Sequence, residues 1–230
     1  MMRDYLILKL SGPLQAWGKE TFEGLRPSEL FPSRSALLGL LGACLGIERT
    51  DQTRQQELTA SVGFAVRVDP VFDQDTKKRI PARKMTDYHT VKNARKDYRG
   101  LSSHDTIQTW REYWQDAAYT VAVWEKENAL VLLAEIEAAL KQPLYTPVLG
   151  RRSCPITRPL FEGRVSADSI LTALANSGSG KETIYSDENI PDHNTIPLRK
   201  RDVPIIHQPR QFASRIVYMA AEKGDGHVSE

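Results

Sequence analysis

Side chains that could bind a metal ion or a nucleotide are present, but they lack the spacing that those ligands need. The five histidines show neither an HxxxH nor an HExxH pattern, and the two cysteines, Cys44 and Cys154, lie far apart in the sequence. Glycine-rich phosphate loops of the GxxxxGK[ST] or GxGxxG type are absent. We therefore expect no metal, no cofactor, no catalytic residues and two reduced thiols.

Phosphate binding is the chemistry that the residues favour, because positive charge is concentrated in one segment. Residues 77–111 contain ten Lys or Arg against three Asp, which gives this segment a charge of +7 within a chain of net charge +2. Such a local cationic patch is typical of a surface that binds a nucleic-acid backbone. A charged loop that is merely solvated would have the same composition, so this alternative stays open.

Aromatic residues are interleaved with these cations. The aromatic or imidazole side chains are Tyr88, His89, Tyr98 and Trp110, and the cations among them are Lys92, Arg95, Lys96, Arg99 and Arg111. Cations that follow a phosphate backbone, together with rings that stack on bases, are what binding of single-stranded RNA requires. We interpret Trp110 itself as a core residue at the base of a hairpin.

A second candidate anion site is the start of a predicted helix, where FPSRS places Ser33, Arg34 and Ser35. Free backbone N–H groups and the positive end of the helix dipole attract an anion, and Arg34 with two hydroxyl groups would strengthen that attraction. In the alternative interpretation, Arg34 points into water or pairs with Glu29. Ser33 or Ser35 is expected to cap the helix.

A third candidate is the loop GRRSCP, which contains Gly150, Arg151, Arg152, Ser153 and Cys154. Glycine gives the backbone room to approach a ligand, and the two guanidinium groups are planar forks that suit phosphate or base edges. A solvated turn would explain the two arginines almost as well.

The elements that must position these residues alternate between strands and helices. Apolar patterns predict strands over 5–10, 61–69, 117–124 and 214–220, and helices from Ser33 or Ser35 to Gly46, over 128–140 and over 166–176. Residues 85–91 and 106–114 form the two strands of a long hairpin. Gly39, Gly42 and Gly46 suggest that a sheet approaches the first helix closely. The tract 185–211 has little periodicity.

This order predicts an α+β fold with a ferredoxin-like, RRM-like domain and an inserted hairpin. We assign residues 1–148 to that domain, with the hairpin over about 79–115, and residues 149–230 to a small C-terminal extension. No apolar run approaches the ~20 residues of a membrane span, and the start MMRDYLILKL lacks the apolar core of a secretory leader. We therefore expect a cytoplasmic protein with no membrane contact.

Several blocks of the sequence closely resemble the CasD subunits of type I-E Cascade, the CRISPR surveillance complex, which belong to the RAMP superfamily. The blocks are SGPLQAWG, FPSRSALLGLLGACLGI, DYHTV, DYRGLSSHDTIQTWREYW, YTPVLGRRSCP and PRQFASR. The resemblance runs from Tyr5 to about Tyr218. It implies a RAMP fold in which the hairpin is a thumb, and a role in antiviral defence.

The resemblance also implies partners and residue roles. The subunit would hold the 5′ handle of the CRISPR RNA beside the backbone and large subunits, and its thumb would displace a base at the handle–spacer boundary, near the target DNA. Arg34, Arg151 and Arg152 would contact the handle, and Tyr88 or Tyr145 would stack on bases. Arg95, Arg99 and Arg111 would be thumb contacts. The candidate RNA-binding set also includes Arg26 and His89.

Two other functions stay open at this stage. Type I-C relatives cut repeat RNA without a metal, and Tyr88, His89 and either Lys84 or Lys92 could imitate their site, with histidine as the general base. Against this, adjacent residues of a strand point to opposite faces. The other alternative is a general single-strand binding module, which would not prefer one RNA end over another.

Overall fold

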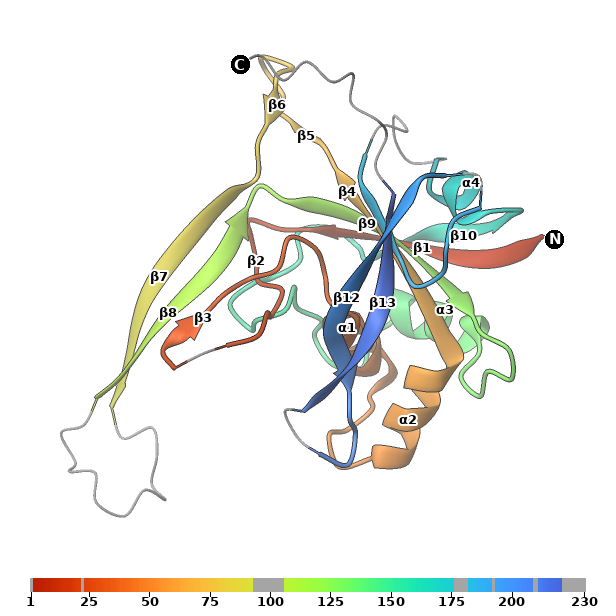
Figure 1. Cartoon of the computed structure of the whole chain (residues 1–230), viewed down its shortest axis with the longest axis horizontal. Coiled ribbons are helices and arrows are strands. Elements are labelled where there is room, and N and C mark those ends of the chain that lie inside the picture. Colours follow the sequence, from red (N-terminus) through yellow and green to blue (C-terminus); the bar gives the residue numbers. More distant parts are fainter. Residues whose placement is uncertain are drawn as a thin grey trace.

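A seven-stranded antiparallel sheet forms the centre of the molecule (Figure 1). The computed structural model describes residues 2–21, 23–92, 106–175, 182–191, 193–208 and 211–220. The strand order is β10-β1-β9-β4-β11-β13-β12. The strands are β1 Arg3–Ser11, β4 Val62–Asp69, β9 Ala118–Glu125, β10 Phe161–Ala167, β11 Ile184–Ser186, β12 Thr195–Pro204 and β13 Phe212–Ala220.

Four of these strands form a ferredoxin-like unit. β1 and β4 are joined through helices α1 (Arg34–Leu45) and α2 (Gln52–Ser61), and β9 and β10 through α3 (Leu133–Lys141). The resulting order β10-β1-β9-β4, with every neighbouring pair antiparallel, is that of a split βαβ fold. The predicted α+β class is therefore confirmed. Helix α2 was not predicted, because only Leu58 and Ser61 of its ten residues are buried.

The sheet is covered on both faces by apolar packing. Alternate residues of β1, such as Leu6 and Leu8, pack with the leucines of α1 in the larger core cluster. The intervening residues Tyr5 and Ile7 pack under α4 (Ile170–Ala175) on the other face. The strands at the centre of the sheet therefore read as continuous apolar runs, since both faces are buried.

The C-terminal residues continue the same sheet, so the expected boundary at residue 148 does not divide it. β10 lies beyond that boundary, yet it pairs with β1 as the edge strand of the ferredoxin-like unit. β11 pairs with β4, and β13 and β12 follow. The tract 185–211, which lacked a clear pattern, contains β12, whose sequence TIPLRKRDVP has two prolines and a run of four charged residues. The charged run conceals the strand from an apolar pattern, and backbone pairing with β13 places it in the sheet.

The predicted hairpin is a long two-stranded arm that projects from the sheet (Figure 1). β7 (Arg83–Lys92) and β8 (Thr106–Gln115) are antiparallel in register over ten residues each. At the base, β2 (Leu14–Gln15) and β3 (Leu25–Arg26) pair with β8, and the small ribbon of β5 (Val71–Phe72) and β6 (Arg79–Ile80) precedes β7. The tip, residues 93–105, lies outside the described residues.

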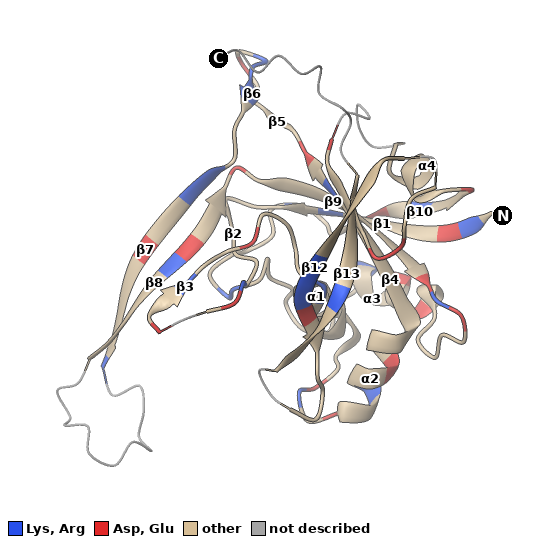
Figure 2. Cartoon of the chain, in the orientation of Figure 1, with Lys and Arg blue, Asp and Glu red and all other residues tan. Residues whose placement is uncertain are grey.

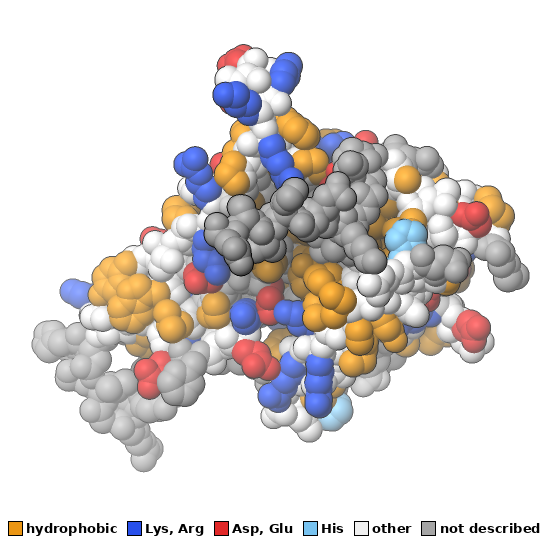
Figure 3. Space-filling model, turned by 45° about the horizontal axis from the view of Figure 1, so that its top comes forward, with side chains coloured by type: hydrophobic (Ala, Val, Ile, Leu, Met, Phe, Trp, Pro, Cys, Tyr) orange, Lys and Arg blue, Asp and Glu red, His pale blue; other side chains and the backbone are white. Residues whose placement is uncertain are grey.

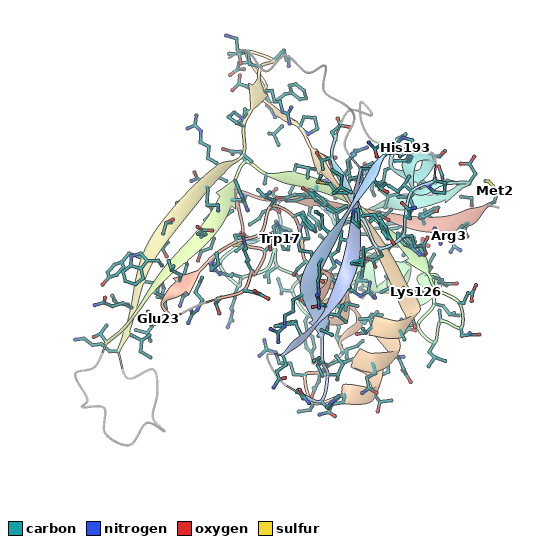
Figure 4. The ribbon with its side chains drawn as sticks, in the orientation of Figure 1. Met2, Arg3, Trp17, Glu23, Lys126 and His193 are labelled. Atoms are coloured by element: carbon teal, nitrogen blue, oxygen red, sulfur yellow. The ribbon has the colours of Figure 1, made fainter. Side chains whose placement is uncertain are left out.

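The segment between β1 and α1 joins the arm to the sheet through Trp17. Figure 4 shows Trp17 between the arm and the sheet, and Glu23 beside the arm. The indole is 1% exposed and meets the ring of Tyr119 edge-on at 6.1 Å. Its backbone N–H donates to Ser28 Oγ at 2.8 Å, and its carbonyl accepts from Glu29 N at 2.6 Å. This irregular segment is thus held by its own hydrogen bonds.

The three glycines of α1 do not mark a close approach of the sheet, contrary to the prediction. Gly39 is exposed, and a Cβ built there would meet no atom within 4 Å. A Cβ at Gly42 would make only ordinary contacts at 3.9 and 4.0 Å. Gly46 is different, because it is the C-cap of the helix with φ of 71°, a left-handed conformation that favours glycine.

Substitution by alanine should separate these two kinds of glycine. Gly39→Ala should raise the free energy of unfolding by about 0.5–1 kcal/mol, since it removes backbone freedom from an open helical position. Gly46→Ala should lower it by about 1 kcal/mol or more, because alanine is strained at positive φ. Urea unfolding followed by circular dichroism would measure both variants. Equal effects at the two positions would contradict this account.

Candidate nucleic-acid interface

The arm has two chemically different faces because side chains alternate along its strands. Tyr88 lies directly opposite Trp110 and Lys84 opposite Trp114, so these residues share one side, which we call the aromatic face. Asp87 lies opposite Arg111 and His89 opposite Thr109 on the other side, the polar face. The two faces offer base stacking and charge contacts, respectively.

The aromatic face exposes a pair of rings to solvent. Tyr88 is 53% and Trp110 40% exposed, and their ring centroids lie 5.5 Å apart with the planes tilted by 52°. Figure 3 shows the resulting hydrophobic patch on the arm. Because Trp110 N–H donates to Gly24 O at 3.0 Å, the strand that carries the tryptophan is fixed. The interpretation of Trp110 as a core residue is therefore wrong.

Trp114 takes the place expected for Trp110 at the base of the arm. Its Nε1 donates to Glu29 O at 2.6 Å, and the Lys84 ammonium lies 5.2 Å from the ring centroid. Lys84 also pairs with Glu112 at 3.1 Å. Since Trp114 lies at the end of β8 nearest the sheet, it is half-buried, while Tyr88 and Trp110 farther out stay exposed.

Glu112 is a junction residue that the sequence reasoning did not single out. Its carboxylate accepts from Ser28 N–H at 3.0 Å and pairs with Lys84. Burial would raise the pKa of Glu112, but the Ser28 N–H and the lysine charge hold it below its ordinary value. The available sequence signal was an acidic residue directly after the basic segment 77–111.

The polar face does not bring Tyr88 and His89 together. His89 Nδ1 lies 3.6 Å from Asp87 Oδ2, on the side of the arm opposite to the ring of Tyr88. Arg111 Nε donates to Thr109 Oγ1 at 3.2 Å on the same polar face. Lys84 is paired with Glu112. The tyrosine, histidine and lysine considered for RNA cleavage therefore do not converge.

In the loop that contains GRRSCP, some residues have structural roles, whereas Arg152 and Ser153 have exposed side chains. Gly150 has φ of 90°, and a Cβ there would lie 1.8 Å from Ala16 O. Cys154 is fully buried, and burial raises the pKa of its thiol. Burial of Cys154 keeps its side chain from RNA, which corrects its prediction as a direct contact. Gly150 is exposed, so its expected backbone contact stays a prediction.

Arg151 ties this loop to the base of the arm. Its guanidinium donates to Glu112 O and to Arg26 O, both at 3.0 Å, and lies over the ring of Tyr113 at 4.6 Å. Arg26 is half-buried in β3 and donates to Leu25 O at 2.9 Å. Arg26 and Arg111 are paired residues of β3 and β8, and Arg151 donates to a carbonyl of each strand.

The start of α1 already binds a carboxylate of the chain itself. Ser33 is the N-cap and accepts from Ala36 N at 3.3 Å, as predicted, and its hydroxyl lies 3.1 Å from that of Ser35. The N–H of Arg34 donates to Asp202 Oδ2 at 2.7 Å. The anion that the helix dipole favours is therefore a side chain of β12.

The Arg34 side chain is buried in a cluster of four charges. Its guanidinium pairs with Asp187 and donates to the carbonyls of Thr59 and Val62, each at 2.8 Å. Arg215 bridges the two acids, since it pairs with Asp187 and donates to both oxygens of Asp202 at 2.6 and 2.9 Å. With 4% of its surface exposed, Arg34 is a structural residue here, which corrects its expected role as a phosphate contact.

The remaining candidate RNA-binding residues, Tyr145, Arg95 and Arg99, are not placed beside the start of α1. Tyr145 is 45% exposed, but its N–H donates to Ala43 O near the end of α1, and the twelve residues of that helix span about 18 Å. Arg95 and Arg99 lie outside the described residues. Among the residues that the structure describes, no group of three potential metal ligands occurs, and no helix is long and apolar enough to cross a membrane.

A ferredoxin-like sheet that carries a long two-stranded arm is the RAMP architecture, and comparison with known proteins agrees with it. The family model described as CRISPR-associated protein (Cas_Cas5) matches residues 5–218. The chain therefore belongs to the Cas5 family of CRISPR-associated proteins. The "CRISPR system Cascade subunit CasD" of Escherichia coli (strain K12) is 52% identical over 229 residues, which cover all of both chains. The predicted resemblance is confirmed.

Solved structures support the same fold. A chain of a "CRISPR RNA-guided surveillance complex" superimposes with a TM-score of 0.64 at 25% identity, over 94% of this chain and 89% of the other. A second structure, titled "Crystal structure of Cas protein", gives a TM-score of 0.60 at 24% identity, over 94% of both chains.

Removal of Arg34 should destabilise the protein strongly. Arg34→Ala leaves two buried carboxylates with one arginine, and breaking a buried ion pair from one side costs about 3–5 kcal/mol. Urea unfolding would measure the loss in the free energy of unfolding. Arg164→Ala, which removes an exposed ion pair with Asp4, is the control and should change little. A small effect of Arg34→Ala would contradict the structural role.

Acid should weaken the same cluster. Burial would raise the pKa of Asp202, but hydrogen bonds and the charge of Arg215, with the N–H of Arg34, hold it below its ordinary value. Such a carboxyl stabilises the fold above its unfolded pKa of about 3.9 and loses this contribution as pH falls through the folded value. The difference in unfolding free energy between wild type and Asp202→Asn should therefore be constant from about pH 7 to pH 5 and shrink below about pH 4. A constant difference down to about pH 2 would refute this.

Proposed function

We propose that this chain is a non-catalytic CRISPR RNA-binding subunit of a Cascade-type surveillance complex. It holds the 5′ handle of the guide RNA and contributes to antiviral interference with DNA. The support is the full-length, 52% identical relative named as a Cascade subunit, and the structural neighbour from an RNA-guided surveillance complex. Its partners would be the guide RNA and the backbone and large subunits, in the cytoplasm.

The observation that carries the RNA-binding proposal is the exposed Tyr88–Trp110 pair on a projecting arm. Adjacent exposed rings form a contiguous apolar patch, which marks an interaction site more strongly than a single exposed ring does. Unstacked bases of single-stranded RNA bind to aromatic faces, each stack contributing about 1–3 kcal/mol. An arm that inserts such rings beside the RNA would displace a base, which is the role we assign to it at the handle–spacer boundary, near the target DNA.

Cations around the arm would bind the RNA backbone. Lys92 and Arg152 are exposed, and Arg111 is half-buried on the polar face. We assign phosphate contacts to these three, with Arg95 and Arg99 as further contacts outside the described residues. Arg26 and Arg151 would position the base of the arm, since their guanidinium groups already donate to backbone carbonyls. Phosphate contacts position the RNA and base contacts give sequence preference.

Metal-independent cleavage of repeat RNA is the alternative that this geometry disfavours. Nucleophile activation requires a general base and its helpers to converge on one 2′-hydroxyl group. Tyr88 and His89 point to opposite faces of the arm, and Lys84 is held by Glu112. The opposite orientation of adjacent residues was the argument raised from the sequence, and the described strand has that geometry.

The direct test measures binding of the mature guide RNA by the full chain and by Tyr88→Ala/Trp110→Ala. The variant should bind at least about tenfold more weakly, which corresponds to the loss of one or more stacks. Phe72→Ala, which removes another exposed aromatic ring (55% exposed), is the matched control and should bind as wild type does. Wild type should also prefer the intact handle over a scrambled one. Equal affinities throughout would refute handle binding.

A denaturing gel of the same mixtures, with chelator present, separates binding from cleavage. Intact RNA agrees with a non-catalytic subunit. A discrete cut that His89→Ala abolishes would instead assign a metal-independent endoribonuclease.

A further inference from the structure

The C-terminal ribbon of β12 and β13 has an inner and an outer face. On the inner face, Lys200 pairs with Glu29 at 3.0 Å, and Asp202 and Arg215 belong to the buried charge cluster. Arg199 and Arg201 alternate with these residues along β12 and therefore point outward. The strand thus buries its carboxylate and presents two guanidinium groups to solvent.

The outer face of β12 and β13 lies on the same side of the sheet as α4, which covers β1, β9 and β10. Ala220 of β13 packs in the cluster beneath α4, and Ile216 and Tyr218 lie on the same face because they precede Ala220 by even numbers of residues. The helix whose main strand contact is with β12 is α1, whose first residue reaches Asp202 on the inner face.

The outer face combines positive charge with an apolar surface. Arg199 lies directly opposite Ile216, which is 46% exposed, and Arg201 lies opposite Ser214. Figure 2 shows the cationic band along β12. Arg201 Nε donates to Phe212 O at 2.8 Å, which fixes the side chain across the ribbon. Neither arginine forms a salt bridge with any residue that the structure describes.

We propose that this outer face, which we call the β12 track, binds the phosphate backbone of single-stranded guide RNA. The inference rests on the proposed function and adds a second RNA contact, distinct from the arm. Arg199 and Arg201 follow one another along the strand at about 6.6 Å, so they line a track rather than a single-anion pocket. Guanidinium groups suit phosphate, and Ile216 with Tyr218 would support ribose and base surfaces.

A competing explanation is protection of the sheet edge. β12 is the last strand in the sheet order, and charged residues on an edge strand discourage pairing with another chain. Edge protection predicts self-association when the arginines are removed, but no change in RNA affinity. RNA binding predicts a changed salt dependence.

The test compares Arg199→Ala/Arg201→Ala with a control that removes two arginines near the opposite edge of the sheet, Arg158→Ala/Arg164→Ala. Labelled mature guide RNA would be titrated with the full chain over a series of salt concentrations. Each phosphate contact on a single strand contributes about 0.7 to the slope of log affinity against log salt, so loss of two contacts should reduce the slope by about 1.4. The control and Arg199→Lys/Arg201→Lys should keep the wild-type slope.

A wild-type slope in Arg199→Ala/Arg201→Ala would overturn the β12 track. Greater self-association of that variant by light scattering, with an unchanged slope, would assign the arginines to edge protection instead. DNA of the same sequence would be titrated in parallel; if the substitution changes only DNA binding, RNA is not the ligand. The arm variant Tyr88→Ala/Trp110→Ala, measured in parallel, distinguishes failure of the track alone from failure of RNA binding by the chain.

Discussion

The fold depends on a balanced set of four buried charges. Arg34 begins α1, Asp187 follows β11, Asp202 lies in β12 and Arg215 in β13, so the cluster connects the ferredoxin-like unit with every C-terminal strand. Burial of a charge is costly unless it is paired and hydrogen-bonded. Here two arginines face two carboxylates, and the spare guanidinium donors of Arg34 reach backbone carbonyls. The strands that form the β12 track are thereby attached to the helix that begins the core.

Arginine has three different roles in this molecule, and only burial and partners distinguish them. Arg34 and Arg215 neutralise buried acids, while Arg151 binds backbone carbonyls and stacks on Tyr113. Arg152 and Arg199 have exposed side chains. The first two roles stabilise the framework, which leaves the third for ligands. A sequence count of positive charge cannot separate these roles, because all of them use the same residue type.

Much of the architecture could be predicted because apolar periodicity and chain order report burial directly. Strands β1, β4, β9 and β13, helices α1 and α3, and the arm follow from such patterns. What could not be predicted depends on contacts distant in sequence. Arg34 meets Asp187, 153 residues away; β12 is paired through its backbone, and α2 buries little of its surface. The sequence could not show which of Trp110 and Trp114 is the more buried, because both lie on the same face of β8 and differ only in distance from the sheet.

The two-faced arm constrains how its sequence can vary. The ring pair lies on one face and the Asp87–His89 pair on the other because every side chain alternates in register from the base of the arm. Inserting a single residue in β7 between the base and Tyr88 would send the tyrosine to the histidine side and leave Trp110 without its neighbour. Insertions of two residues, matched in both strands, would keep the faces and only lengthen the arm. Between the base of the arm and the ring pair, homologous arms should therefore differ in length by even steps per strand.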